Sequence, residues 1–141
     1  MKLADLQSQF TARKPLTVDQ CKTLAPDLGS LIGKPDATVD GGGTNSYSPT
    51  EALCEIVAQT NSAGASIELH IQLPPLTANL QTAAAQNGSA SLRVGDQYYL
   101  TIQVGADLSR PNPLKIDEVT PNLDAWLQKV ADRIDTSGMA G

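Results

Sequence analysis

An alternation of apolar and polar residues over residues 65–73 constrains the fold of this chain more than any other pattern. The apolar side chains recur at every second position: Ile67, Leu69, Ile71 and Leu73. The residues between them are polar: Glu68, His70 and Gln72. Successive side chains of a strand point to opposite faces, so this segment is predicted to be a strand covered on one side. Pro74 and Pro75 end it, because proline lacks the amide hydrogen that a strand ladder needs.

Two elements after this strand indicate how its apolar face is covered. Residues 92–94 and 98–104 alternate in the same way and meet at Gly95-Asp96-Gln97, which predicts an antiparallel hairpin. Thr120 and Pro121 are typical of a helix start, and an apolar stripe follows them: Leu123, Trp126, Leu127, Val130 and Ile134. The sequence therefore predicts an α+β fold, with a small antiparallel sheet of about three or four strands packed against amphipathic helices. The sheet is expected between residues 65 and 104.

The N-terminal part of the chain is predicted to be helical. Leu3, Leu6 and Phe10 have the spacing of one face of a short helix, which should end before Pro15. Thr17 and Gln20 match the capping box of a second helix, and Pro26 should end that helix. A further helical turn is expected over residues 27–32.

The middle of the chain carries three weaker predictions. Residues 48–51, Ser-Pro-Thr-Glu, favour a helix over residues 49–60, although residues 54–57 could also alternate as a strand. Residues 76–84 have helical spacing, and Asn87-Gly88 is a good helix stop. Residues 34–47 are rich in turn-forming residues and are interpreted as a long loop, a kind of segment that is often functional.

The length of the chain limits the number of domains, and its charge limits the kinds of partner. With 141 residues, the chain is expected to form one domain over residues 15–136, preceded by a helical arm (1–14) and followed by a flexible tail (137–141). The net charge of -5 and the scattered cations argue against nucleic acid and anionic lipid as partners. No apolar run approaches the roughly 18 residues of a membrane span. The chain is expected to be soluble, cytoplasmic if Met1 is the native start and exported if a leader has been removed.

Cys21 and Cys54 are the only cysteines, and they lack the close spacing of zinc or redox motifs. The favoured interpretation is two small buried thiols, because free cysteine is among the most buried residue types. The alternative is a disulfide between them, which would imply an oxidising compartment.

The candidates for chemistry are few, and each has a simpler explanation. His70 is the only histidine and is expected on the polar face of its strand, where it serves as a surface residue. Gly41-Gly42-Gly43-Thr44 lacks the lysine of a phosphate loop and is interpreted as flexible. The carboxylates in the C-terminal region are expected on a solvated face: Asp117, Glu118, Asp124, Asp132 and Asp135. We therefore expect no enzyme, no cofactor and no metal site.

The second half of the chain resembles the type III secretion chaperone-like fold. The resemblance is carried by the order of the strand over residues 67–73, the helix ending at Asn87, the hairpin and the helix around Trp126. It implies a non-enzymatic, often dimeric binder of partner proteins. A weaker likeness, to small envelope domains of actinobacteria with two spaced cysteines, implies export and a Cys21–Cys54 bridge.

These observations favour a non-enzymatic protein-binding or chaperone/adaptor-like domain, of bacterial type and acidic. The alternative is an exported cell-envelope or ligand-sensing domain with a Cys21–Cys54 disulfide. A protein partner is expected, and a homodimer is one option. The expected binding surface consists of Glu68, His70, Gln72 and Tyr99.

Overall fold

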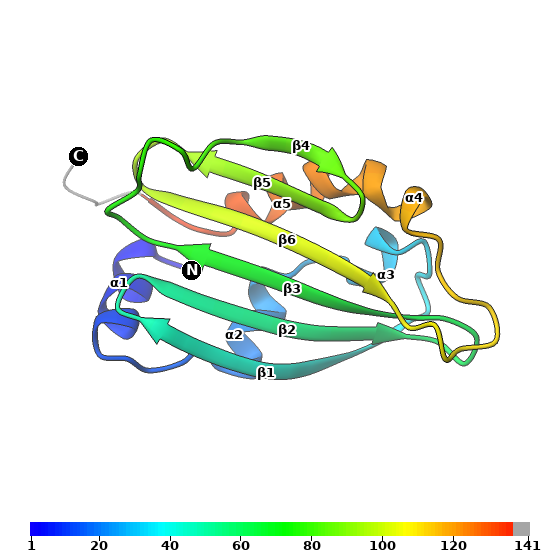
Figure 1. Ribbon diagram of the computed structural model, residues 1–141. Coiled ribbons are helices and arrows are strands. Elements are labelled where there is room, and N and C mark those ends of the chain that lie inside the picture. The colour runs from blue at the N-terminus through cyan, green and yellow to red at the C-terminus, as the bar shows by residue number, and fades with distance from the viewer. Residues whose placement is uncertain (137–141) are drawn as a thin grey trace.

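The computed structural model describes residues 1–136, apart from the side chains of residues 41–48, and consists of helices packed against one antiparallel sheet (Figure 1). The strands are β1 (Thr38–Ser48), β2 (Glu51–Gln59), β3 (Gly64–Gln72), β4 (Ala83–Gln86), β5 (Ser89–Val94) and β6 (Tyr98–Ala106). The helices are α1 (Leu3–Thr11), α2 (Val18–Leu24), α3 (Leu28–Leu31), α4 (Ile116–Val119), the 3₁₀ helix η1 (Thr120–Asn122) and α5 (Leu123–Asp132). The predicted α+β class is therefore confirmed. The predicted tail, residues 137–141, lies outside the described residues.

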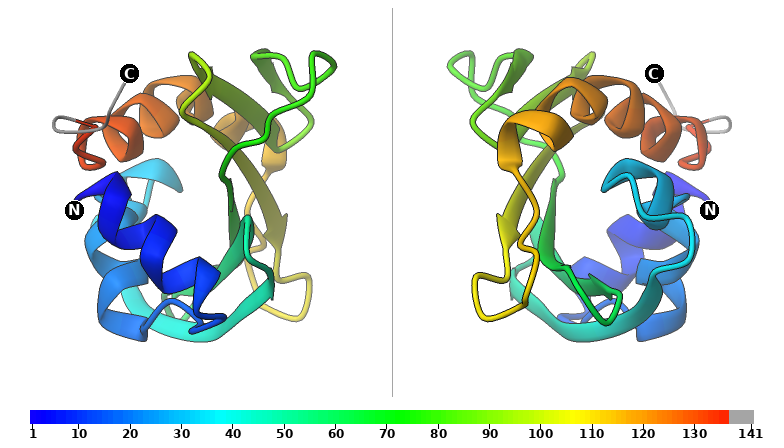
Figure 2. Two further views of the ribbon diagram at one scale, coloured as in Figure 1. Left: turned by 90° about the vertical axis from the view of Figure 1, so that its left-hand side faces the viewer. Right: turned by 90° about the vertical axis from the view of Figure 1, so that its right-hand side faces the viewer.

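The sheet is larger than the sequence predicted. It has six strands in the order β1-β2-β3-β6-β5-β4, so the expectation of about three or four strands, confined to residues 65–104, is wrong. The sheet curves around the helices, which lie on its concave side (Figure 2). We call the side that the helices cover the inner face and the opposite side the outer face.

The inner face holds the core of the molecule. In the central strands β2, β3 and β6, every second residue is buried against the helices: Ala52, Cys54, Ile56, Ala58, Ile67, Leu69, Ile71, Leu100, Ile102 and Val104. The helices contribute Leu3, Leu6, Phe10, Leu24, Leu123, Trp126, Leu127 and Val130 to the same cluster. Because a half-covered strand alternates with a period of two, this burial also determines which side chains lie on the outer face. Among the described residues, no helix is long and apolar enough to span a bilayer.

Several local predictions are confirmed. Strand β3 and the β5–β6 hairpin lie where the alternation placed them, and α1, α2 and α3 match the N-terminal predictions. The Thr17 hydroxyl accepts from the backbone N–H of Gln20, while the Gln20 side chain accepts from the backbone N–H of Thr17, which completes the predicted capping box. In α5, Trp126 is buried, and its ring N–H donates to the carbonyl of Pro26.

The prediction of a helix over residues 49–60 is wrong, because this segment forms β2. Ser48 pairs with Glu51, so Pro49 and Thr50 form the tight turn between β1 and β2. Ser, Pro and Thr suit a turn as well as a helix start, so the local signal did not distinguish the two. Pairing of Glu55 with Glu68 and of Ile56 with Ile67 shows that β2 is one of the central strands of the sheet.

Two other predictions for the middle of the chain are also wrong. Residues 34–47 do not form one long loop, because most of them belong to β1, which pairs with β2 through an irregularity between Gly41 and Thr44. Residues 76–84 form no helix; they are mostly irregular, and β4 begins at Ala83. In both places, pairing with the next strand of the chain overrides the local preference of glycine for turns and of alanine for helix.

The two cysteines form a disulfide, which corrects the favoured interpretation of two free thiols. Cys21 lies on the buried side of α2 and Cys54 on the inner face of β2, with their Cα atoms 5.7 Å apart. This separation is within the range that a disulfide spans. The bond joins the N-terminal helices to the sheet across 33 positions of sequence.

Removing the bond should lower the stability of the fold. The double variant Cys21→Ala/Cys54→Ala is expected to lose about 3–4 kcal/mol of unfolding free energy, because a closed loop of this length restricts the unfolded chain. Urea denaturation followed by Trp126 fluorescence measures the loss. Reducing the unmodified chain should move its midpoint to that of the double variant, and an unchanged midpoint on reduction would contradict the prediction.

Tyr98 makes the stability of the fold depend on pH in the alkaline range. It lies on the inner face of β6, and its hydroxyl donates to the carbonyl of Ala131 at 3.3 Å. Burial and, secondarily, the negative charge of Asp132 raise the pKa of Tyr98 to about 12. The folded chain therefore holds this proton more tightly than the unfolded chain, whose tyrosine has a pKa of about 10. The stability that this group contributes is intact below about pH 10 and is lost as the pH rises through about 12.

We expect Tyr98→Phe to remove this component. The unfolding free energy of the unmodified chain should fall between about pH 10 and pH 12 more steeply than that of Tyr98→Phe. Urea midpoints across that range, with phenolate absorbance recorded in parallel, measure the difference. Parallel curves for the two proteins would show that burial does not raise the pKa of Tyr98.

Candidate functional site

The outer face of the sheet carries the candidate binding residues in aligned rows. The sequence-predicted residues Glu68, His70 and Gln72 all lie on this face of β3, and Tyr99 lies opposite Gln72 on β6. The row through His70 continues to Leu53 on β2 and to Thr101 on β6. The structure thus brings the four predicted residues onto one surface, as the alternation of β3 implies.

His70 has an acidic neighbour on this surface. Its Nε2 lies 3.7 Å from Oε2 of Glu68, and the two side chains are 44% and 38% exposed. Among the described residues, His70 has no recorded hydrogen bond to a serine, threonine or cysteine hydroxyl or thiol, which a nucleophilic mechanism would need. His70 and Glu68 therefore form a pair of partly exposed surface residues.

A second carboxylate stands beside Glu68. Glu55 on β2 is directly opposite Glu68 on β3, and both residues are half-buried. Like charges placed directly opposite each other in an antiparallel pair are destabilising. The row continues through Gln103 on β6 to Ser89 on β5, neither of which is charged. The centre of the outer face is therefore acidic without a neighbouring Lys or Arg in the same row.

Next to this acidic row the surface is hollowed. One hollow, of about 340 Å³, is lined by Val57, Ser66 and Gly105 among others. A second, of about 300 Å³, is lined by Glu68 and Gln103 among others and shares Ser66 and Gly105 with the first. The shared residues make the two hollows one continuous depression, which we call the outer trough.

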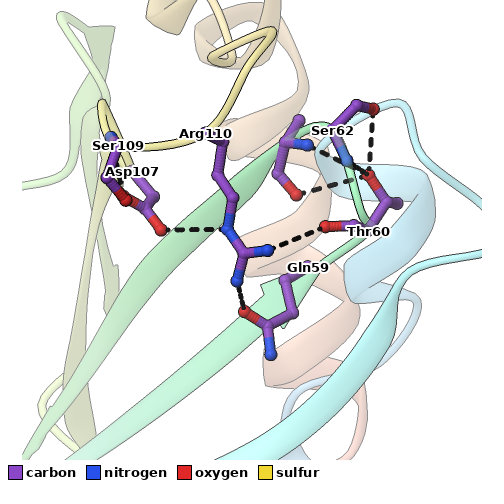
Figure 3. A network of polar contacts seen from close by, with 7 residues as sticks. Gln59, Thr60, Ser62, Asp107, Ser109 and Arg110 are labelled. Atoms are coloured by element: carbon purple, nitrogen blue, oxygen red, sulfur yellow. Dashed lines mark hydrogen bonds and ion pairs between the residues drawn. The ribbon is translucent and has the colours of Figure 1, made fainter.

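The turn after β6, whose Asp107 lines the outer trough, is tied to the β2–β3 connection by a network of polar contacts (Figure 3). Arg110 pairs with Asp107 at 3.2 Å and donates to the carbonyl of Thr60 and to the side chain of Gln59. The Ser109 hydroxyl and backbone N–H, followed by Arg110, hold the pKa of the Asp107 carboxyl below its ordinary value. These contacts fix the turn of residues 107–110 to the β2–β3 connection.

The segment of residues 74–82 is anchored at the other end of the outer face, beyond the outer trough. The Arg93 guanidinium donates to the carbonyls of Thr77 and Leu80, both at 2.8 Å, and pairs with Asp96 at 2.9 Å. The Tyr99 hydroxyl donates to the carbonyl of Gln81 at 3.0 Å. Tyr99, one of the predicted surface residues, is therefore engaged in holding this segment in place.

Other features of the described residues give weaker evidence of a functional site. Another hollow, of about 440 Å³, lies between the end of α3 and α4 and is lined by Lys34, Lys115 and Glu118 among others. Of the predicted solvated carboxylates, Asp124 accepts from the backbone N–H of Ala85, which links α5 to β4. Within residues 1–136, no group of three or more His, Cys, Asp or Glu is arranged to hold a metal ion.

Sequence reasoning missed the residues that shape the outer trough. Glu55 was assigned to a helix, so its position opposite Glu68 could not be inferred. Gly105 could have been noticed, because it follows the alternating run of β6 and glycine is unfavourable in a strand. Arg93 and Arg110 gave no local signal, because their partners lie up to 51 positions away in the sequence.

Arg93 provides a direct test of how the 74–82 segment is held. Arg93→Met keeps most of the side-chain length but removes the donors, so cleavage within this segment by thermolysin should accelerate by at least about tenfold. Arg133→Met is the matched control, because Arg133 is exposed and donates to one carbonyl, that of Thr23. Cleavage at the unmodified rate in Arg93→Met would contradict the anchoring role.

Comparisons with known proteins identify no family or fold for this chain. A scan against protein-family models, a search of curated proteins and a search of solved structures each give no match for this chain.

Proposed function

We propose that this chain is a non-enzymatic binding domain that works in an oxidising compartment outside the cytoplasm and contacts a protein partner through the outer face of its sheet. This combines the two functions that the sequence favoured, a protein-binding domain and an exported envelope domain. The observation that carries the proposal is the buried Cys21–Cys54 disulfide.

The disulfide supports the proposed location in an oxidising compartment. Protein disulfides persist in secreted, periplasmic and cell-surface proteins and are rare in a reducing cytosol. Cys21 is 1% exposed and Cys54 is fully buried, so the bond is part of the core between α2 and β2. A bond in that position suits a structural role, because catalytic and redox-sensing cysteines are usually accessible to their partners.

The outer face supports the binding role. Helices cover the inner face, whereas the middle of the outer face has no covering element in the described part of the chain (Figure 2). The two ends of that face are fixed by Arg93 and Arg110 through contacts with distant segments. A surface that is held at both ends and left open in the middle loses little conformational entropy when a partner binds.

Photo-crosslinking in the native source tests both parts of the proposal. A photoreactive amino acid in place of Gln103, which is exposed on the outer face, should yield a covalent adduct with one partner protein. The same amino acid in place of Gln128, an exposed residue of α5 on the helical side, is the matched control and should yield none. Chain recovered from the same cells and alkylated on denaturation should have no free thiol until it is reduced.

Two outcomes would overturn the proposal. Two free thiols in freshly alkylated chain would exclude an oxidising compartment. Adducts of equal yield at positions 103 and 128, or none at position 103, would exclude the outer face as the binding surface.

A further inference from the structure

Gly105 occupies a strand position where the fold itself does not require glycine. Its backbone has no positive φ, and a Cβ added there would meet no heavy atom within 4 Å. By contrast, Gly88 has a φ of +79° and a Cβ there would lie 2.9 Å from the carbonyl oxygen of Val104. Glycine inside a strand weakens it and commonly marks a place where a ligand or another backbone approaches closely. Gly105 forms part of the floor of the outer trough, so the open space lies where a partner would sit.

Leu108 provides an exposed apolar side chain in the same turn as Asp107, which lines the outer trough. It is 80% exposed, the most exposed large apolar residue in the described part of the chain. It stands in the turn of residues 107–110, which Arg110 and Asp107 fix through contacts with Gln59, Thr60 and Ser109 (Figure 3). An exposed leucine on a rigid support is already ordered for binding, whereas a leucine on a mobile tip is not.

Within the described residues, two carboxylates at the outer trough lack a lysine or arginine partner: Glu68, which lines the trough, and Glu55, which stands next to it. Glu55 stands opposite Glu68 in register, and Glu68 has the weakly basic His70 as its recorded partner at 3.7 Å. The arginines near the two ends do not supply the missing charge, because Arg93 is paired with Asp96 and Arg110 with Asp107. A cation placed between the two carboxylates would relieve their mutual repulsion.

We propose that the outer trough binds an extended, basic segment of a partner protein. A lysine or arginine of that segment lies between Glu55 and Glu68, and an apolar side chain lies over Gly105 beside Leu108. This inference rests on the proposed binding function of the outer face and specifies the chemistry of the partner. A second copy of the chain is a poor occupant, because it carries the same two carboxylates and a net charge of -5.

The test uses the full chain and two octapeptides, one alternating lysine with valine and the other alternating glutamate with valine. Backbone amide resonances are followed during titration. The basic peptide should shift Ser66, Gln103 and Gly105, and its affinity should fall by about tenfold between about 0.02 M and 0.3 M salt. The acidic peptide should leave these resonances unchanged.

Two variants locate the binding. Glu55→Gln/Glu68→Gln should weaken binding of the basic peptide by about fivefold to tenfold, whereas Glu118→Gln, an exposed carboxylate on α4, should not change it. Gly105→Val should fill the floor of the outer trough and weaken binding by about tenfold, and it should fold, because its Cβ enters open space. Thr101→Val on the same face of β6 is the steric control.

The outcomes that would overturn this inference are distinct from those that would overturn the proposed function. Equal binding of both peptides, or unchanged affinity in Gly105→Val, excludes the proposed basic segment. Amide shifts that grow with the concentration of the chain alone would identify a second copy as the occupant instead. If the peptides fail but a photoreactive residue at position 103 still captures a partner, this inference falls and the proposed function stands.

Discussion

Packing of helices from both ends of the chain onto the inner face of one sheet is the interaction on which the rest of this structure depends. Residues 3–31 contribute one set of helices, which lies nearest β1 and β2, and residues 116–132 contribute the other, which lies nearest β5 and β6. Both sets bury apolar side chains in the same core. Neither set covers the sheet alone (Figure 2). The strands are therefore buried on one side along their length, and this one-sided burial places the charged residues of β2 and β3 on the outer face. The disulfide adds a covalent link between one helical set and the sheet.

Elements with one clear local pattern could be predicted from the sequence, and elements whose local pattern suits more than one structure could not. The alternation in β3, the hairpin of β5 and β6 and the apolar stripe of α5 each lie within a short stretch of sequence, so their patterns identify them. The middle of the chain is different. Residues 48–51 suit a helix start and a tight turn equally well, and only pairing of β2 with β1 and β3 decides between them. The alanines around β4 favour helix locally, but they pair with β5.

The same distinction applies to the candidate site. That Glu68, His70 and Gln72 share a face follows from the alternation of one strand, so the sequence was sufficient for them. Glu55 and Gly105 belong to two different neighbouring strands, and their positions depend on the register of β2 and of β6 against β3. Register is determined by which residues are buried together, and a single sequence does not state that. The sequence offered the Cys21–Cys54 bond only as an alternative, because a separation of 33 positions says nothing about distance in space.

One small feature joins the two ends of the described chain. The backbone N–H of Leu3 donates to the carbonyl of Asp135 at 2.8 Å, and the N-terminal ammonium group donates to the carbonyl of Arg133. Lys2 and Asp135 form an isolated parallel bridge on the helical side of the molecule. The first and last residues that the structure describes therefore lie side by side. Any protein or solid support fused at either end is joined to the domain on its helical side, and the outer face of the sheet is directed away from that junction.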